Sequence, residues 1–492
     1  MTRQTLLLLT ILLCAISSPY SATAQVDFST PGPFPLHQVI LLDQKTPRDL
    51  GLVDVPILAD VWGWTDPHNC EEYIIVSADG VHVPFPILGA DRVSSAYNPV
   101  GGVAFARLTP QGDILALGVW RHPTVSQLDH GDVQVFANHA YVTGESPGYG
   151  LVIFDLTQLR GRTPCPSPED CADTGLNQLP GFAVVKTSLK DTTGREVAMS
   201  GGHNLTIDEE SGFMLIHAAN TFKDDRQGKF RARSTKVLRI NPGDPTKPIL
   251  LADLNKASHD GWITRYHGPD VQHKNKIIML LANGYKHDFI EANLTEIFNN
   301  PKNGPIIYQL TDADGSFHLK KLSQLVTYEN DDFGHQLSLS EDHRFIFFND
   351  ENEDQAPGPA RQIVFDISKL KRPKELFQCF HIEESISHDS YVLGNYLFTG
   401  NYTSGLRVVD ISEVEGTMCL DGSLNEMAYI DTEPRLDSFS DVLTFEISPD
   451  VTLQAHSGFS GVWGTYPYFK SGYVVMSDTL HGLFSIKLDL PD

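Results

Sequence analysis

The sequence predicts an all-β fold, a seven-bladed β-propeller built from four-stranded antiparallel blades. Three observations lead to it. Short alternating apolar runs are broken by Gly, Pro, Asn and Asp, which is typical of strands and turns. Amphipathic helical segments are scarce. A degenerate repeat also recurs along the chain, at roughly the 40 to 50 residues that a propeller blade requires.

One part of the repeat is an apolar strand that ends in Asp followed by a small polar residue. It reads LVIFDLT at 151–157, QIVFDIS at 362–368 and LRVVDIS at 406–412. Alternating apolar side chains suit a strand packed between two neighbouring sheets. The Asp side chain can accept hydrogen bonds from nearby backbone N–H groups, so it ends the strand in a turn.

A second part of the repeat precedes this strand and consists of a polar residue, an alternating strand, a turn and another strand. Two units begin near 61–64 and 462–464, and five begin at Asp132, His203, His259, His335 and His388. Each unit alone would expose two apolar faces, and only closure of a ring buries them all. A β-helix would show a shorter and more regular period. We therefore expect a signal peptide at 1–24, an N-terminal extension at 25–57 and the propeller at 58–492.

The N-terminus predicts secretion. Arg3 precedes an apolar run from Leu6 to Ile16, and the small residues Ala22 and Ala24 suit a cleavage site. No later stretch reaches the roughly 18 apolar residues of a spanning helix. The chain ends at Asp492 directly after an apolar strand, so we expect no anchor and a protein free in solution outside the cell.

The net charge restricts the expected binding partners, and the cysteines suggest disulfide bonds. The formal net charge is −25, with 62 acidic and 37 basic residues, so nucleic acid is not an expected partner. An acidic surface suits solubility and divalent cations instead. In an oxidising compartment a disulfide between Cys165 and Cys171 would close a small loop, and Cys379 could pair with Cys419. Cys70 is then left over, buried or free.

Histidines at matching positions form the first candidate site. If the strands that they begin are innermost, their side chains converge at one mouth of the central channel, where they could hold a transition metal such as zinc. The residues that follow them, such as Asn204 and Gln336, could orient the imidazoles. The alternative is that each histidine hydrogen-bonds the neighbouring blade and has only a structural role. The predicted members of this ring are Asp132, His203, His259, His335 and His388.

Two further candidates lie in loops. An acidic run follows a strand and could supply oxygen ligands to calcium, although its spacing is not that of an EF-hand; the alternative is a solvated acidic loop. Its candidate ligands are Asp350, Glu351, Glu353 and Asp354.

Asp270 and His273 could form an acid–base pair, or could stabilise a turn around Pro269. Asn293 heads the sequon most suited to a glycan.

The sequence contains no phosphate-binding Gly-rich loop, no Gly-x-Ser-x-Gly and no His-Glu-x-x-His. These absences favour a secreted binding or scaffold protein that recognises an extracellular protein or glycan through its loops, with a structural metal ion as an option. The alternative is a metal-dependent hydrolase of the lactonase or phosphoesterase type, whose ion (calcium or zinc) sits at the channel mouth.

The chain also resembles a known family, the LVIVD-repeat proteins of the choice-of-anchor B group. The resemblance extends from about Leu58 to the C-terminus and implies an extracellular propeller displayed by an anchor, with no agreed catalytic activity. This sequence departs from the family by ending without an anchor. The matching segments, in chain order, are 62–66, 150–159, 268–270 with His273, 401–402 with 405–407, and Trp463 with 466–468.

Overall fold

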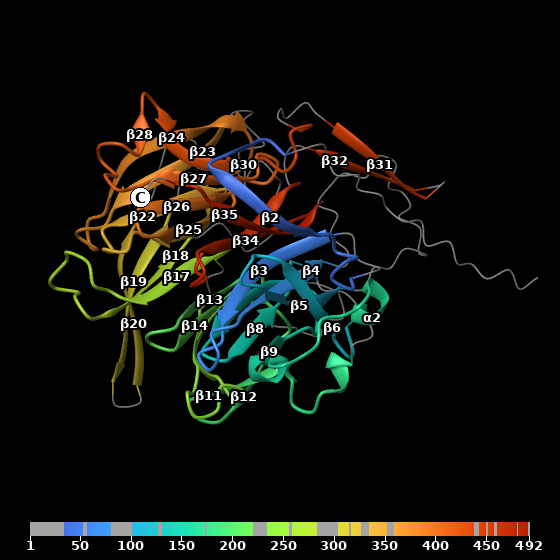
Figure 1. Cartoon of the computed structure of the whole chain (residues 1–492). Coiled ribbons are helices and arrows are strands. Elements are labelled where there is room, and N and C mark those ends of the chain that lie inside the picture. The colour runs from blue at the N-terminus through green and yellow to red at the C-terminus, as the bar shows by residue number, and fades with distance from the viewer. Residues whose placement is uncertain are drawn as a thin grey trace, which may run out of the picture.

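A computed structural model of the chain consists almost entirely of β-strands (Figure 1). The signal-peptide prediction lies outside the described residues. These residues are 34–52, 57–79, 101–125, 130–172, 175–219, 234–254, 258–282, 304–313, 316–325, 334–351, 359–436, 442–448, 451–456, 460–479 and 481–490.

Within these ranges, seven sheets of four to six strands form the blades, and an eighth, two-stranded sheet lies apart from them. Each innermost strand contacts the innermost strand of the next blade, and the last contacts the first, so the blades close a ring. The seven-bladed propeller prediction is therefore confirmed. The innermost strands, in order around the ring, are β3, β7, β13, β17, β21, β25 and β33.

The blades follow one another along the chain, and each is built outward from its innermost strand. The first three blades contain β3 (Ile57–Thr65), β4 (Glu72–Asp79), β5 (Gly102–Leu108) and β6 (Ile114–Trp120); β7 (Asp132–Phe136), β8 (His139–Thr143), β9 (Leu151–Asp155) and β10 (Ala183–Lys186); and β13 (Leu205–Asp208), β14 (Phe213–Ala219), β15 (Ser234–Arg239) and β16 (Ile249–Leu254). The next two contain β17 (Gly261–Arg265), β18 (Ile277–Leu281), β19 (Ile306–Ala313) and β20 (Ser316–Gln324); and β21 (Gly334–Leu339), β22 (Phe345–Asp350), β23 (Pro359–Asp366) and β24 (Lys374–Glu384).

The sixth blade contains β25 (Asp389–Leu393), β26 (Tyr396–Gly400), β27 (Leu406–Asp410) and β30 (Glu426–Ile430), and the seventh β33 (Val462–Tyr466), β34 (Tyr473–Asp478), β35 (Gly482–Leu488) and β2 (Val39–Lys45). The short strands β1 (Leu36–His37), β11 (Ser188–Asp191), β12 (Glu196–Ala198), β28 (Cys419–Leu420) and β29 (Ser423–Leu424) extend the outer edges of three blades. The hairpin β31 (Val442–Ser448) and β32 (Val451–His456) projects from the ring (Figure 1). The helical turns are η1 (Leu156–Leu159), α2 (Pro168–Ala172) and η2 (Leu176–Gln178), and no helix of the described part could span a membrane.

Seven apolar clusters fill the spaces between the blades, one for each adjacent pair. Strand β22 shows how alternation produces this arrangement. Phe345 and Phe347 pack against the sixth blade, whereas Ile346 and Phe348 pack against the fourth. Successive side chains of a strand point to opposite faces, so one strand contributes to two cores. Burial of both faces of every blade is what stabilises the ring.

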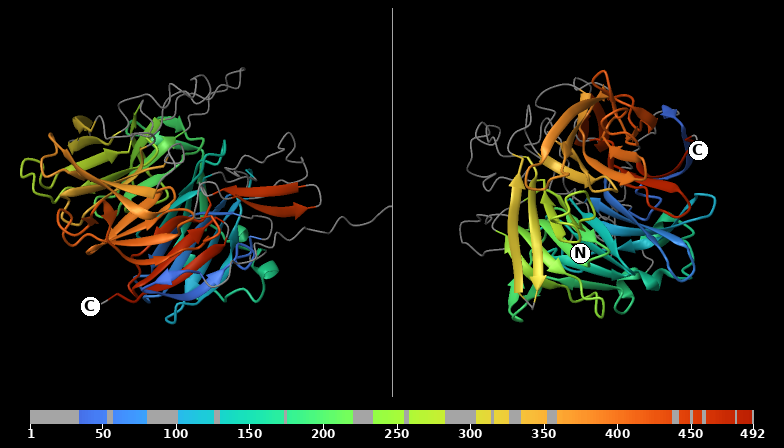
Figure 2. Two further views of the ribbon diagram at one scale, coloured as in Figure 1. Left: turned by 90° about the horizontal axis from the view of Figure 1, so that it is seen from above. Right: turned by 90° about the vertical axis from the view of Figure 1, so that its left-hand side faces the viewer.

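An N-terminal strand closes the ring. The segment that the sequence analysis assigned to an extension supplies β2, which pairs antiparallel with β35 as the outer strand of the last blade. Figures 1 and 2 show this blue strand beside the red strands of the C-terminus. Val39 is buried with Phe484 and Ile486 in the cluster between the sixth and seventh blades. The two ends of the described chain are thus held together by sheet hydrogen bonds and a shared core.

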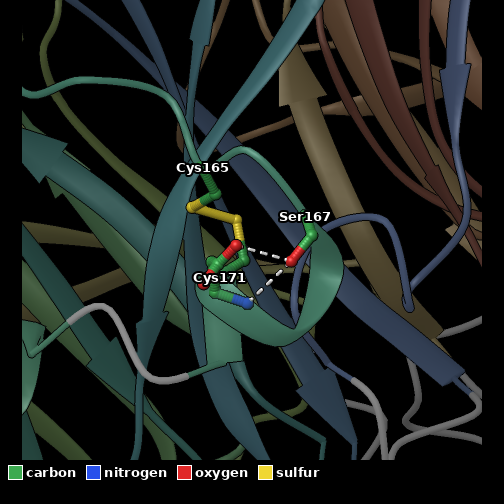
Figure 3. The surroundings of a disulfide bond; sticks show 4 residues. Cys165, Ser167 and Cys171 are labelled. Carbon is green, nitrogen blue, oxygen red and sulfur yellow. Dashed lines mark hydrogen bonds between the residues drawn. A yellow bond between two sulfur atoms is a disulfide. The ribbon is translucent and has the colours of Figure 1, made fainter.

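Both predicted disulfides are present. Cys165 and Cys171 close a short loop around α2, where the Ser167 hydroxyl donates to Asp170 (Figure 3). Cys379 of β24 is bonded to Cys419 of β28, which ties the edge strands to the fifth blade. Cys70 is exposed and not part of a disulfide.

The antiparallel connections determine which residues meet at each mouth of the channel. In the fifth blade Gly334, at the start of β21, lies opposite Asp350, at the end of β22. The start of each innermost strand therefore shares one mouth with the end of the second strand. We call this the front mouth. The turns between first and second strands lie at the opposite mouth.

Candidate functional site

Four histidines from consecutive blades converge at the front mouth, as the repeat pattern predicts. Neighbouring imidazole centroids are 3.9 Å apart for His203 and His259, 4.0 Å for His259 and His335, and 4.3 Å for His335 and His388. All four residues are buried. We call this set the imidazole ring. Each histidine lies at or just before the start of an innermost strand, so the shared strand position brings the side chains together.

Glu351 reaches the imidazole ring from the loop after β22. Its Oε2 atom lies 3.4 Å from Nε2 of His335 and 3.9 Å from Nε2 of His259, and Oε1 lies 3.7 Å from Nε2 of His388. The Tyr402 hydroxyl donates a 2.6 Å hydrogen bond to Oε1. The sequence analysis assigned Glu351 to a separate calcium loop. The geometry instead places it with the histidines.

The distances between the possible ligand atoms are compatible with binding of a single metal ion. Ligand atoms about 2.1 Å from a tetrahedral zinc ion are roughly 3.4 Å from one another. Ligand atoms of His203, His259 and His335 lie within 4.8 Å of one another, and so do those of His335, His388 and Asp389. His335 belongs to both sets. Three imidazoles with a carboxylate beside them form a donor set that zinc, copper, iron or nickel accepts.

The groups that orient the imidazoles differ from those expected. Glu145, in the loop after β8, lies 3.1 Å from Nδ1 of His203. The backbone carbonyl oxygen of Trp463 lies 2.8 Å from Nδ1 of His388. Asp389, the residue after His388, stays 3.6 Å from the nearest imidazole nitrogens. A repeat position predicts only groups that recur in every blade, and neither Glu145 nor the Trp463 carbonyl belongs to such a set.

Electrostatics keep the imidazoles of His259, His335 and His388 neutral. Burial, followed by the proximity of the other imidazoles, lowers the pKa of His259 and His335 well below the usual histidine value. Burial lowers the pKa of His388 to about 3. Neutral imidazole is the form that binds a metal, because protonation occupies the lone pair. At neutral pH these three residues therefore offer metal-binding nitrogens without first losing protons.

A ring of carboxyl groups lies in the channel beside the imidazoles. We call the set Asp60, Asp132, Asp260 and Asp389 the carboxyl ring; all four residues are buried. Burial, and next the charge of a neighbouring carboxyl group, raises the pKa of Asp60, Asp260 and Asp389 well above the usual value. Burial raises the pKa of Asp132 to about 6.

Asp132 belongs to this second ring and not to the imidazole ring. Its carboxylate accepts a hydrogen bond from the backbone N–H of Leu205 in the next blade. In the same way Asp60 accepts from Val133 at 3.1 Å, and Gln336 accepts from Ser390 at 3.1 Å. Asp132 therefore aligns with the residue that follows each histidine. These residues join neighbouring blades, and so do two of the histidines. His203 contacts Glu145 of the second blade and His388 contacts the Trp463 carbonyl of the seventh, as the structural alternative weighed for the histidines expects.

The carboxyl ring lines a cavity of about 20 Å³, which has room for about one water molecule or ion. An organic substrate is too large for it and would have to approach the imidazoles from the front mouth. Aromatic side chains pack around His388 at that mouth. The ring of Trp463 lies 4.9 Å from that of His388, 5.6 Å from that of His130 and 5.9 Å from that of Tyr402.

The remaining candidates do not join the imidazole ring. Asp350 is fully buried and lies 3.4 Å from Arg361, while Glu353, Asp354 and the sequon Asn293 lie outside the described residues. His273 Nδ1 is 3.0 Å from Asp270 Oδ2, as the pairing predicted. That pair, however, follows the end of β17 and so lies at the opposite mouth. Asp270 also accepts the Leu370 N–H at 3.0 Å, which ties the turn to the fifth blade.

Fold and site together define a seven-bladed β-propeller with a cluster of metal-binding residue types at one mouth. No known family model matches the chain, and no curated protein resembles it in sequence. Among solved structures, a protein from Lactobacillus plantarum is similar to it with 12% identity and a TM-score of 0.44, over 82% of this chain and 88% of that one. Membership in the LVIVD-repeat group stays a prediction.

Proposed function

We propose that the chain is a secreted, metal-dependent hydrolase whose ion is bound at the front mouth of the propeller. The observation that carries the proposal is the convergence of the imidazoles of His259, His335 and His388 on the carboxylate of Glu351. His203, His259 and His335 are the preferred ligands, since they form the set of three imidazoles whose nitrogen atoms lie within 4.8 Å of one another. A bound zinc ion would supply an activated water and polarise the bond to be cleaved.

Other side chains would accept the proton, orient the ligands and contact the substrate. Tyr402 holds one oxygen of Glu351, and the other oxygen faces His335 and His259, so Glu351 is positioned to accept a proton from a water at the ligand cluster. Glu145 and the Trp463 carbonyl keep His203 and His388 in their orientations. Trp463, which is partly exposed, would contact the substrate as it enters. This arrangement supports hydrolysis of a lactone or phosphoester.

A binding or scaffold role is the second candidate. Two hairpins favour it, because β19–β20 and β31–β32 extend beyond the ring and enlarge the surface available to an extracellular protein or glycan (Figures 1 and 2). In that case the imidazole ring would hold a structural ion only.

Elemental analysis combined with a hydrolase panel tests these proposals. The protein is purified without a histidine tag, and its metal content and its activity on lactones and aryl phosphoesters are measured. We expect about one transition-metal ion per chain. His335→Ala should lose metal and activity but remain folded. The matched control is His267→Ala, which alters a histidine that is exposed at the opposite mouth and should change neither.

Each outcome decides between the roles. Metal without hydrolysis supports the scaffold role with a structural ion. A metal-free wild-type protein, or hydrolysis that His335→Ala leaves unchanged, overturns the hydrolase proposal.

A further inference from the structure

His335 presents its two ring nitrogens to different groups. Its Nε2 atom faces Oε2 of Glu351, and the same oxygen faces Nε2 of His259. Its Nδ1 atom lies 3.6 Å from Oδ1 of Asp389. The two nitrogens of an imidazole point away from each other, so a metal ion held at Nε2 leaves Nδ1 available on the other edge of the ring.

Asp389 and His388 complete a second donor set around Nδ1 of His335. Ligand atoms of these three residues lie within 4.8 Å of one another. His388 has the same orientation as His335, with Nε2 toward Glu351 and Nδ1 3.6 Å from Oδ2 of Asp389. The backbone carbonyl oxygen of Trp463 lies 2.8 Å from that Nδ1 atom. Two imidazole nitrogens, a carboxylate and a carbonyl oxygen are therefore close together on the edges of the rings that do not face Glu351.

Two atoms of this donor set face each other without a hydrogen-bond partner. Nδ1 of His335 and Oδ1 of Asp389 have none among the described residues, although the two residues are only 1% and 5% exposed. Buried polar atoms that stay unpaired are costly to the folded state. Their separation of 3.6 Å is too long for a hydrogen bond, but it is close to the roughly 3.4 Å between two ligands of a tetrahedral zinc ion.

The channel has room for an ion beside these donors. His388, Asp389 and Trp463 all line the cavity of about 20 Å³, which is about the size of one water molecule or ion. Two of the donors are imidazole nitrogens, which suit zinc, whereas calcium and magnesium prefer oxygen ligands.

We propose that the front mouth binds a second zinc ion through His335, His388 and Asp389, so that the His335 ring bridges two ions. The proposal rests on the proposed function, which places the first ion at Nε2 of His335. Its protons balance as follows: His335 releases its remaining N–H proton to solvent, and the ring proton of His388 moves from Nδ1 to Nε2, which faces Oε1 of Glu351. Because a proton must leave, the second ion binds more weakly than the first, and the protein as purified contains about one ion.

The second ion has a structural role. Its donors are buried, so a substrate does not reach it from the front mouth. They come from the fifth, sixth and seventh blades, in which His335, Asp389 and Trp463 belong to the innermost strands. An ion that binds the folded ring and not the unfolded chain stabilises the closed ring.

Zinc titration of the full-length protein tests the proposal. The protein is stripped with EDTA, the chelator is removed, and zinc alone is added during calorimetry in two buffers that differ in ionisation enthalpy. We expect two equivalents to bind, the second with release of at least one proton and a rise in melting temperature. Asp389→Asn should keep the first ion and weaken binding of the second by about 100-fold or more, because a direct ligand matters at least as much as an outer partner.

The matched control is Asp60→Asn. Asp60 is a buried carboxyl group of the same cavity but does not belong to the donor set. This variant should bind the second ion nearly as tightly as the wild type does. The melting temperature of metal-free Asp389→Asn should equal or exceed that of the metal-free wild type, since the change removes a buried acidic group, and this measurement shows that the variant folds.

The outcomes separate this proposal from the hydrolase proposal. Two bound ions without hydrolysis support the second site and overturn only the hydrolase. A single bound ion together with hydrolysis overturns only the second site. A second ion that binds without proton release, or an equal loss of the second ion in Asp389→Asn and Asp60→Asn, also overturns it.

Discussion

The Oε2 atom of Glu351 lies 3.4 Å from Nε2 of His335, although one residue follows the second strand of the fifth blade and the other belongs to its first. The antiparallel pairing of β21 with β22 brings both to the front mouth. Ring closure then adds His259 and His388 from the flanking blades at 3.9 and 3.7 Å. A local hairpin and the closed ring together create the cluster.

Replacing Glu351 tests its place in the ligand cluster. Glu351→Gln keeps an oxygen that can accept the Tyr402 hydrogen bond but removes the negative charge beside the imidazoles. We expect zinc affinity to fall by about 10- to 100-fold, as it does when metal-site partners are altered. Competition against a chelator measures the change. Glu415→Gln, which removes an exposed partner of Arg344, should leave zinc affinity unchanged. Equal zinc affinity of Glu351→Gln and the wild type would show that the charge of Glu351 does not contribute to metal binding.

Closure of the ring by β2 can be tested with two neighbouring residues. Val39 is 4% exposed and belongs to an interblade cluster, whereas Ile40 on the same strand is 45% exposed. Val39→Asp places a carboxylate in an apolar core and should lower the free energy of unfolding by about 2–5 kcal/mol. Ile40→Asp should change it by no more than about 0.5 kcal/mol. Urea denaturation measures both, and similar effects of the two variants would argue against a closing role for β2.

Acid should weaken a buried ion-pair cluster between the fifth and sixth blades. Glu426 lies 2.7 Å from His381 and 3.2 Å from Arg407. Burial by itself raises the pKa of the Glu426 carboxyl, but the hydrogen bonds and charges of His381 and Arg407 outweigh it and lower the pKa to about 2. Because the folded-state pKa lies below the ordinary value of 4.5, this contribution is complete above pH 4.5 and is lost as the pH falls toward 2.

The difference between the two pKa values corresponds to a contribution on the order of 3 kcal/mol. Glu426→Gln should therefore be less stable than the wild type at pH 7, and the gap should narrow steadily between pH 4.5 and pH 2. Guanidinium denaturation of both proteins across this range measures the gap. A gap that stays constant with pH would contradict the assignment.

The two disulfides should contribute unequally. The bond between Cys379 and Cys419 spans 40 residues, whereas that between Cys165 and Cys171 spans 6. Loop-closure entropy predicts contributions of about 4 and about 2 kcal/mol, because the longer cross-link restricts the unfolded chain more. Paired Cys→Ser variants at each bond, compared by urea denaturation under oxidising conditions, measure the difference. A larger loss from the Cys165–Cys171 pair would contradict the entropic explanation.

The sequence by itself determined the all-β class, the seven units and the alignment of the four histidines, and it indicated the short disulfide loop from Cys165 to Cys171. These features are local or strictly repeated. Alternation within one strand assigns Phe347 and Phe348 to opposite faces, and equal strand positions place His203, His259, His335 and His388 at one level.

Only the tertiary structure decided what surrounds the histidines. Glu145 and Glu351 come from loops after second strands, and a repeat pattern does not show how far a loop side chain reaches toward the axis. Asp60 belongs to the carboxyl ring, but the sequence analysis recognised the first repeat unit by its tryptophans and did not single out Asp60. Asp132 aligns with the residue after each histidine, one position later than the sequence analysis placed it. The outer strand of the last blade comes from the N-terminus, because a ring closes by pairing segments that are distant in sequence. Such contacts depend on closure, and closure is a property of all seven blades together.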